Sequence, residues 1–399
     1  MVIKYIGSKR TLVPLIRSVA ERLPVRTACD LFAGTTRVGQ ALRSLGLVVQ
    51  SNDLATYSET LGQAYIAADE TVDRARLAGV LEELSELPGR DGYFTEAFCR
   101  QARYLQPHNG MRVDAIREAI DAYELSEVER GIVLTSLLEG ADRVDSTTGL
   151  QMAYLKSWAP RSFDRLELRM PAAVSGPAGL VTRLDANALA SQLDVDLVYV
   201  DPPYNQHSFF SNYHVWETLV RWDAPESYGI ANKRIDCRER KSRYNSKRRA
   251  PAAMVELFAE LRAPWLLVSV SDEGFHDAEE IRGLLADGRH VARIDVDFKR
   301  YVGAQIGIYN PAGKKVGRVA RLRNREHLLL AGPDGALVES IAGELQRELA
   351  VVHGPASTAA VAQAAASSGS RAAAGATRAV AVKSPAPANA ADQSPRPRA

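Results

Sequence analysis

The chain of 399 residues is poor in cysteine and has no long apolar run. Its three cysteines, Cys29, Cys99 and Cys237, form no C-x-x-C pair, which excludes a zinc ribbon, a zinc finger and a redox dithiol. No stretch reaches about 18 uncharged apolar residues, the length that spans a membrane as a helix. Basic residues interrupt the first ten positions, where a signal peptide has its apolar segment. These absences predict a soluble, cytoplasmic protein without disulfides.

Histidine is sparse as well, with seven residues in the chain. The nearest pair, His207 and His214, is seven positions apart, and no H-x-x-x-H pattern occurs, so we predict no metal site. Large aromatic side chains in helical or strand patterns usually pack in the core. We expect this of all the tryptophans, Trp158, Trp216, Trp222 and Trp265.

The charges nearly balance, with 50 Lys and Arg against 48 Asp and Glu, but they are unevenly distributed. Residues 351–399 contain 18 Ala, 5 Pro and no aromatic residue, a composition that predicts a disordered tail. Residues 233–249, here called the basic strip, contain nine basic and two acidic residues, a net charge of +7. Within residues 1–350, the positive charge is therefore concentrated in the basic strip.

A strip of this kind suits contacts with phosphates, which make nucleic-acid binding dependent on salt. The alternative is a solvated loop, because basic clusters also act as localisation or solubility features. The candidate DNA contacts are Arg238, Arg240, Lys241, Arg243, Lys247 and Arg248.

Strand and helix patterns alternate at both ends of the chain. After a predicted helix at 11–23, residues 27–32, 37–46 and 47–53 form a β–α–β unit, whose strands lie parallel in a sheet. From 56 to 140 the pattern is helical, with helices at 76–87, 112–125 and 126–140. Strand patterns then return at 179–185, 194–201, 264–271, 290–298 and 326–331, with helices at 251–262 and 277–288. The prediction is one α/β sheet interrupted by an inserted helical subdomain.

The strand at 194–201 ends in Asp201-Pro202-Pro203-Tyr204, at the edge where α/β sheets bind ligands. The prolines stiffen the turn and leave the Pro202 carbonyl free to accept a hydrogen bond. A carboxylate and a carbonyl together can accept both hydrogens of an exocyclic amine, and the Tyr204 ring offers a face for a planar base. This pattern predicts a pocket for an aromatic amine, while the bland alternative is an ordinary turn.

The turn 30-DLFAGTT-36 lies between a strand and a helix, where free backbone N–H groups can receive a polar ligand. It lacks the third glycine of the dinucleotide-binding pattern G-x-G-x-x-G. Asp53 ends the next strand, where a carboxylate can accept both hydroxyls of a ribose. The two features suggest a nucleoside with an amino-acid tail, such as S-adenosyl-L-methionine; a glycine turn and a surface Asp are the alternative.

With DLFAG at 30–34, SND at 51–53 and DPPY at 201–204, the chain resembles the Dam-like and type II restriction-modification adenine-N6 DNA methyltransferases. The opening 4-KYIGSK-9 is similar to the N-terminal segment of that family, K-[WY]-x-G-[GS]-K. The stretches 153–158 and 204–223 also resemble family segments, and the likeness spans about residues 3–330. One position departs from the pattern, because Thr36 stands where the family usually has its second glycine.

The resemblance implies a Rossmann-like methyltransferase sheet that binds S-adenosyl-L-methionine and transfers its methyl group to adenine N6 in DNA. It gives Asp201, Pro202 and Tyr204 as the catalytic residues. The cofactor-binding residues that it implies are Tyr5, Lys9, Asp30, Phe32, Gly34, Asp53 and Asp185. Within this scheme, 1–55 and 179–350 form the catalytic domain, 56–178 recognises the target and 351–399 is the tail. We expect a monomer that acts in restriction-modification or in protection of host or phage DNA, and a cognate restriction endonuclease is left open.

Three alternatives share these residues. The amine chemistry applies equally to cytosine N4, so the choice of adenine rests on the resemblance. A DNA-binding regulator that keeps the pocket as a relic would use only the basic strip. Methylation of RNA or of a protein glutamine is the third, although the glutamine enzymes resemble N-P-P-Y rather than D-P-P-Y.

Overall fold

The structure is a computed structural model, and it describes residues 3–5, 9–152, 154–155, 157–299, 308–309, 315–317 and 323–353. Residues 1–347 form one compact unit. Apart from 351–353, the predicted tail lies outside the described residues, as do residues 6–8 of the N-terminal motif. None of the helices in the described ranges combines the length and apolarity needed to cross a bilayer.

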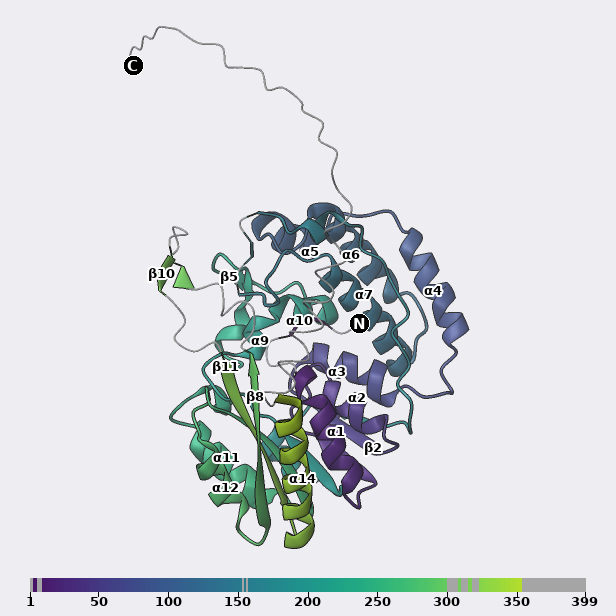
Figure 1. Cartoon of the computed structure of the whole chain (residues 1–399). Coiled ribbons are helices and arrows are strands. Elements are labelled where there is room, and N and C mark those ends of the chain that lie inside the picture. The colour runs from purple at the N-terminus through teal and green to yellow at the C-terminus, as the bar shows by residue number, and fades with distance from the viewer. Residues whose placement is uncertain are drawn as a thin grey trace, which may run out of the picture. The chain divides into compact units, whose positions relative to one another are not determined.

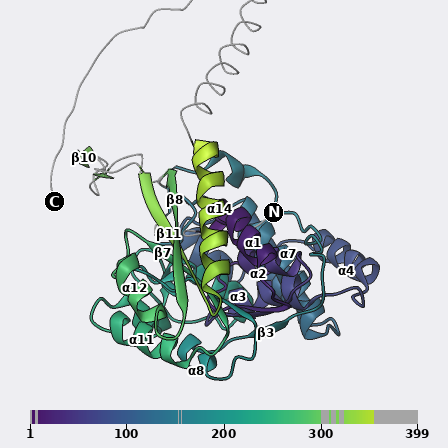
Figure 2. The same cartoon turned by 60° about the horizontal axis from the view of Figure 1, so that its bottom comes forward.

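A seven-stranded sheet forms the centre of the unit, in the order β3-β2-β1-β4-β7-β11-β8 (Figures 1 and 2). Its first five strands are parallel: β3 (Leu180–Thr182), β2 (Val48–Asn52), β1 (Thr27–Asp30), β4 (Leu197–Val200) and β7 (Trp265–Ser271). The strand β11 (Arg323–Gly332) runs antiparallel to both β7 and β8 (His290–Lys299). All four residues of β4 are buried, as its continuous apolar sequence predicts. This topology confirms the predicted Rossmann-like α/β fold.

Helices cover both faces of this sheet. The helices α8 (Ala186–Ala190), α11 (Ala250–Glu260) and α12 (Ala278–Leu285) bury apolar side chains against β1, β4 and β7 in one core cluster. A second group contains α1 (Val13–Arg22), α2 (Arg37–Arg43) and α14 (Gly335–His353), and Arg22 of α1 pairs with Glu344 of α14 at 3.5 Å. The purple α1 and yellow-green α14 lie side by side in both views (Figures 1 and 2).

Helices between β2 and β3 form a second hydrophobic core: α3 (Thr56–Gly62), α4 (Arg74–Glu86), α5 (Tyr93–Thr95), α6 (Pro107–Ile120) and α7 (Glu127–Arg143). The predicted helices at 76–87, 112–125 and 126–140 correspond to α4, α6 and α7, while α5 and the π-helical turns Gln63–Ala67 and Glu96–Gln101 were not predicted. Ser126 and Glu129 cap α7 reciprocally. Trp216, which follows the DPPY motif, packs in the same core.

The segment after β4 contains α9 (Phe209–Asn212) and α10 (His214–Arg221), followed by the hairpin β5 (Ser227–Tyr228) and β6 (Lys233–Arg234). The 3₁₀ turns Ile235–Arg238 and Arg243–Asn245 continue the basic strip, so much of it has regular structure. The second small hairpin pairs β9 (Ile308–Tyr309) with β10 (Lys315–Gly317). The prediction for the tryptophans is right for three of the four: Trp216 and Trp265 are buried, and the half-buried Trp222 packs against the helical core. Trp158 is half-buried beneath Arg103.

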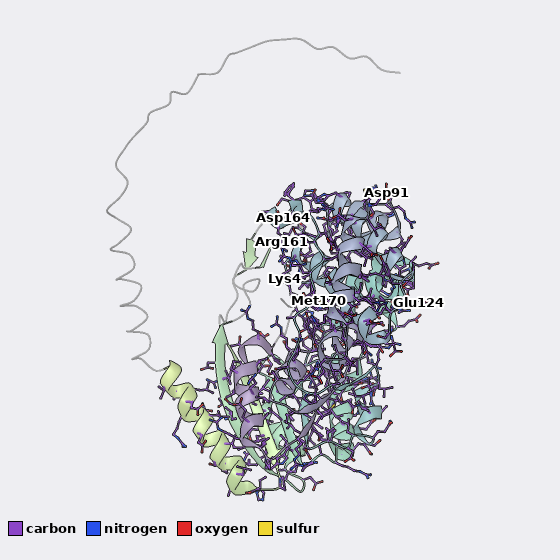
Figure 3. All side chains as sticks on the ribbon, turned by 90° about the vertical axis from the view of Figure 1, so that its right-hand side faces the viewer. Lys4, Asp91, Glu124, Arg161, Asp164 and Met170 are labelled. Atoms are coloured by element: carbon purple, nitrogen blue, oxygen red, sulfur yellow. The ribbon has the colours of Figure 1, made fainter. Side chains whose placement is uncertain are left out.

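The N-terminal segment is held on the helical part of the molecule. Lys4 pairs with Asp142 of α7 at 3.2 Å and with Asp145 at 3.1 Å. Arg161 pairs with the same Asp145 at 2.6 Å, and Figure 3 labels both basic residues. This ion cluster ties Lys4 to α7 and to the segment that follows it, and so helps to fix where the adjacent Tyr5 lies.

Candidate active site

A cavity of about 360 Å³ lies at the carboxyl ends of β1, β2 and β4. The structure brings together in its wall eight of the ten predicted catalytic and cofactor residues, Tyr5, Lys9, Asp30, Phe32, Gly34, Asp53, Asp185 and Asp201. Residues 239–245 of the basic strip also line it, among them the basic residues Arg240, Lys241 and Arg243. Residues far apart in the sequence, from Tyr5 to Asn245, therefore meet at one edge of the sheet.

The turn between β1 and α2 forms one wall of the cavity. Gly34 has a φ of +52°, and a Cβ at this position would lie 3.2 Å from the Tyr5 ring, so a side chain would be strained and would press on that ring. The Gly34 N–H donates to Asp53 Oδ2 at 2.9 Å. Thr36, at the position of the missing glycine, also has a positive φ of 58°. The backbone at position 36 thus has the left-handed conformation that favours glycine, although the residue there is a threonine.

Asp53 and Asp30 end neighbouring strands. Asp53 accepts the N–H groups of Gly34 and Ala55, at 2.9 and 3.0 Å, through different oxygens. Each carboxylate oxygen has a second lone pair, so Asp53 can still accept the hydroxyls of a diol. Asp30 accepts the Gly39 N–H at 2.8 Å and is almost fully buried. Burial raises the pKa of Asp53, and it raises the pKa of Asp30 to about 7, so Asp30 is partly protonated at neutral pH.

Aromatic rings form the wall around Tyr5. The Tyr5 ring stacks on Tyr213 with centroids 4.3 Å apart and on Phe209 at 5.3 Å, and its hydroxyl lies 3.2 Å from that of Tyr57. On another wall, the Phe32 ring meets Tyr244 edge to face at 5.3 Å. The sequence singled out Tyr5 and Phe32 but gave no site role to Tyr57, Phe209, Tyr213 or Tyr244. For Phe209 and Tyr213, the family-like stretch 204–223 was the available signal.

Asp201 lies at the end of β4, in contact with a lysine. Lys9 Nζ is 3.1 Å from Asp201 Oδ1, and Lys9 also pairs with Glu326. Burial raises the pKa of Asp201 to about 6; Lys9 opposes this rise and Glu326 adds to it. Glu326 was not predicted as a site residue. Its signal was weak: a single acidic residue at the start of the apolar strand pattern 326–331.

Pro202 and Tyr204 lie beside this cavity. Both line an adjacent cavity of about 20 Å³, together with Tyr244 and Phe275. The Phe275 N–H donates to the Tyr204 carbonyl at 2.8 Å, which ties the DPPY turn to the loop after β7. Burial raises the pKa of Tyr204. The wall of the larger cavity contains Asp201 and Pro203 of this motif.

The six candidate DNA contacts differ in their surroundings. Arg243 makes two hydrogen bonds to Glu256, at 2.7 and 3.1 Å. Arg240 lies 3.4 Å from the buried Glu217 and 4.5 Å from the centre of the Phe210 ring. Arg238 stacks on Tyr228 at 4.2 Å and remains exposed. The other three candidates are exposed: Lys241, Lys247 and Arg248.

Another basic residue of the strip has a structural role. Arg234 is only 2% exposed and makes two hydrogen bonds to Asp223, at 2.6 and 2.7 Å, and two more to Asp236. Arg234 also donates to Thr218 Oγ1 of α10 at 3.2 Å, which ties the β5–β6 hairpin to that helix. The full net charge of +7 is therefore not available to a ligand. Within the described parts of the chain, no three His, Cys, Asp or Glu side chains are arranged to hold a metal ion.

Comparison with known proteins places these features in a family. Residues 5–278 match the model of the D12 class N6 adenine-specific DNA methyltransferases. The chain belongs to this class. The family that the sequence motifs suggested is thereby confirmed.

Curated relatives of this chain are modification enzymes. The modification methylase StsI of Streptococcus sanguinis is 30% identical over 71% of this chain and 46% of its own length. The type II methyltransferase M.FokI of Planomicrobium okeanokoites gives the same three figures. M.NlaIII of Neisseria lactamica is 27% identical over 74% of this chain and 92% of its own length. The chain thus spans about half of StsI and M.FokI, and nearly all of M.NlaIII.

Proposed function

We propose that this protein transfers a methyl group from S-adenosyl-L-methionine to the N6 amine of adenine in DNA. The observation that carries the proposal is the position of Asp201. It lies 3.1 Å from Lys9, in the wall of the cavity that also contains Asp30, Asp53 and Asp185. An acceptor for the target amine thereby shares one cavity with acceptors suited to a nucleoside.

The residues of the cavity fit this cofactor. Asp53 has free lone pairs for the ribose hydroxyls, and Asp185 caps α8 through Oδ1, which leaves acceptor capacity for an adenine amine. Asp30 and the closely packed turn at Gly34 suit the amino-acid part. A volume of about 360 Å³ lies at the lower end of the range of ligand pockets. The bound cofactor supplies a methyl group activated by a positively charged sulfur.

Asp201 and its neighbours are suited to increase the nucleophilicity of the adenine N6 amine, which is low. The lone pair of an adenine amine is delocalised into the purine ring. If Asp201 and the Pro202 carbonyl each accept one N–H, the lone pair becomes localised on N6. In the transfer the N6–methyl bond would form as the methyl–sulfur bond breaks, and the amine would then lose one proton. Asp201 acts here as an ionised acceptor, which its contact with Lys9 favours. The base must first leave the duplex, at a cost of a few kcal/mol, and Tyr204 offers a ring on which it stacks.

The DNA surface is assigned to two parts of the chain. We infer that exposed basic residues of the strip contact phosphates, above all Arg238, Lys241, Lys247 and Arg248. The helical segment 56–178 is the proposed target-recognition part. The names of the relatives support a role in type II modification.

Nucleoside mass spectrometry tests the proposal directly. DNA incubated with the enzyme and methyl-labelled S-adenosyl-L-methionine should contain labelled N6-methyladenine. Label in N4-methylcytosine would favour the second candidate substrate, which shares the amine geometry. DNA binding without label in DNA would favour the non-catalytic regulator and overturn the proposal.

A further inference from the structure

Glu326 is a buried carboxylate outside every motif of the active site. It lies on β11, opposite Ser271 of β7, and only 5% of it is exposed. Leu328 and Leu329, two and three residues further along β11, are fully buried. A carboxylate at such a place is costly unless it is paired and hydrogen-bonded.

The partners of Glu326 lead directly to Asp201. Ser269 Oγ donates to Glu326 Oε1 at 3.0 Å, and Lys9 pairs with the same oxygen. Lys9 Nζ is 3.1 Å from Asp201 Oδ1. The row Ser269–Glu326–Lys9–Asp201 thus joins β7, β11, the 3₁₀ turn Lys9–Thr11 and the end of β4. Among the described residues, no donor reaches Asp201 Oδ2.

We propose that Glu326 is a positioning residue for methyl transfer, an inference that rests on the proposed function. It holds Lys9 on Asp201 Oδ1, so that Asp201 Oδ2 stays available to the target amine. Lys9 is only 8% exposed, and its ammonium group has two carboxylates as fixed partners. With Asp201 as its one remaining carboxylate partner, the flexible Lys9 side chain has more freedom to shift across Asp201 and cover Oδ2.

The titratable groups that face Asp201 determine how the reaction rate should depend on pH. These groups are Lys9 of the 3₁₀ turn, Glu326 of β11, Asp30 of β1, Tyr199 of β4 and Tyr204 of the motif. Lys9 is the one cation among these five. The Lys9 ammonium favours ionised Asp201, whereas the Glu326 carboxylate opposes it. Loss of either charge should therefore move the pH dependence of the reaction, in opposite directions.

The test measures single-turnover methylation rates of the full chain against pH, at saturating DNA and cofactor. Glu326→Gln should lower the rate about tenfold and move its acid limb to lower pH by up to about one unit. Lys9→Met should move the acid limb to higher pH. Glu326→Asp retains the charge, so its acid limb should stay in place while the rate recovers only in part. Glu339→Gln on α14 is the matched control at an exposed glutamate and should change neither quantity.

A reduced rate for Glu326→Gln with an unmoved acid limb would overturn the inference, because it would show a merely structural role. If Glu326→Gln alone fails to fold, the pair Lys9→Met and Lys9→Met/Glu326→Gln carries the test. The second substitution should then return the acid limb toward lower pH, and no return would overturn the inference. Failure of the proposed function is a different result, in which the wild-type protein methylates no DNA.

Discussion

The charged side chains of the cavity wall and of the basic strip differ in burial: several of those in the wall are buried or half-buried and have fixed partners, whereas several of those in the strip are exposed to solvent. In the wall, Asp30, Asp53 and Asp201 are buried or half-buried, and each accepts a backbone N–H or contacts Lys9. In the strip, Lys247 and Arg248 are exposed to solvent. Between these extremes stands Arg243, which is paired with Glu256.

This difference follows the ligands that each region is proposed to bind. A small cofactor and a flipped base need acceptors held in place, so the wall carries the cost of buried charge. Exposed lysine and arginine side chains bind DNA phosphates and displace the counterions of the DNA. This binding does not require the side chains to be held in one fixed geometry. Substitutions in the wall should therefore change chemistry and cofactor affinity, and substitutions in the strip should change the salt dependence of DNA binding.

The largest effect is expected for Asp201→Ala in the wall. Loss of the acceptor should lower methyl transfer by about 10³-fold or more, while cofactor affinity stays within about tenfold. Rate measurements and calorimetry with the cofactor separate the two quantities. An equal loss of both would assign Asp201 to cofactor binding instead.

Asp53→Ala should act on the cofactor. Loss of its charge-assisted contacts to the ribose should weaken cofactor affinity by about 1–3 kcal/mol. Asp53 also fixes the Gly34 N–H, so the turn should become less ordered. Calorimetry that shows unchanged affinity would remove Asp53 from the site.

Much of this wall was predictable from local patterns. The β–α–β unit, the buried strand before Asp201 and the turn at Gly34 each arise within a few consecutive residues. Glu326 was not predictable in this way, because its role depends on the antiparallel register of β11 against β7, set by residues far away in the chain. The role of Arg234 was not predictable from a local pattern either. It belongs to the basic strip, but its ion pairs with Asp223 and Asp236 give it a role in stabilising the fold.

Asp30→Asn tests the cost of buried charge in the wall. The pKa of Asp30 is about 7 in the folded protein, above its ordinary value of 3.8, so the folded state binds the proton more tightly between these values. The free energy of unfolding therefore falls as pH rises from about 4 to about 7. The variant should be more stable than wild type by up to about 4 kcal/mol at pH 8 and nearly equal at pH 4. Denaturant unfolding at both pH values checks this, and an equal difference at both would contradict it.

Two matched double variants compare exposed and paired cations of the strip. Lys247→Gln/Arg248→Gln should flatten the dependence of log affinity on log salt by about two units, one for each lost phosphate contact. Arg240→Gln/Arg243→Gln should flatten it by less, because these arginines have acidic partners within the protein. DNA titrations between about 50 and 200 mM salt measure the slopes. Unchanged slopes in both variants would make the strip a solvated loop.

The smallest effect is expected at Thr36, where the turn between β1 and α2 departs from the pattern of its family. A left-handed conformation costs a residue with a side chain about 1–2 kcal/mol, and glycine avoids this cost. Thr36→Gly also loses the hydrogen bond that Gln40 Nε2 donates to Thr36 Oγ1 at 2.9 Å, a bond of about 1 kcal/mol. The net change in stability should therefore be a gain below about 1 kcal/mol. Thr36→Ala is the matched control: it loses the same bond, keeps the left-handed Cβ and should destabilise. Thermal unfolding of the two variants decides, because an alanine variant as stable as the glycine variant would show that the backbone at position 36 is not strained.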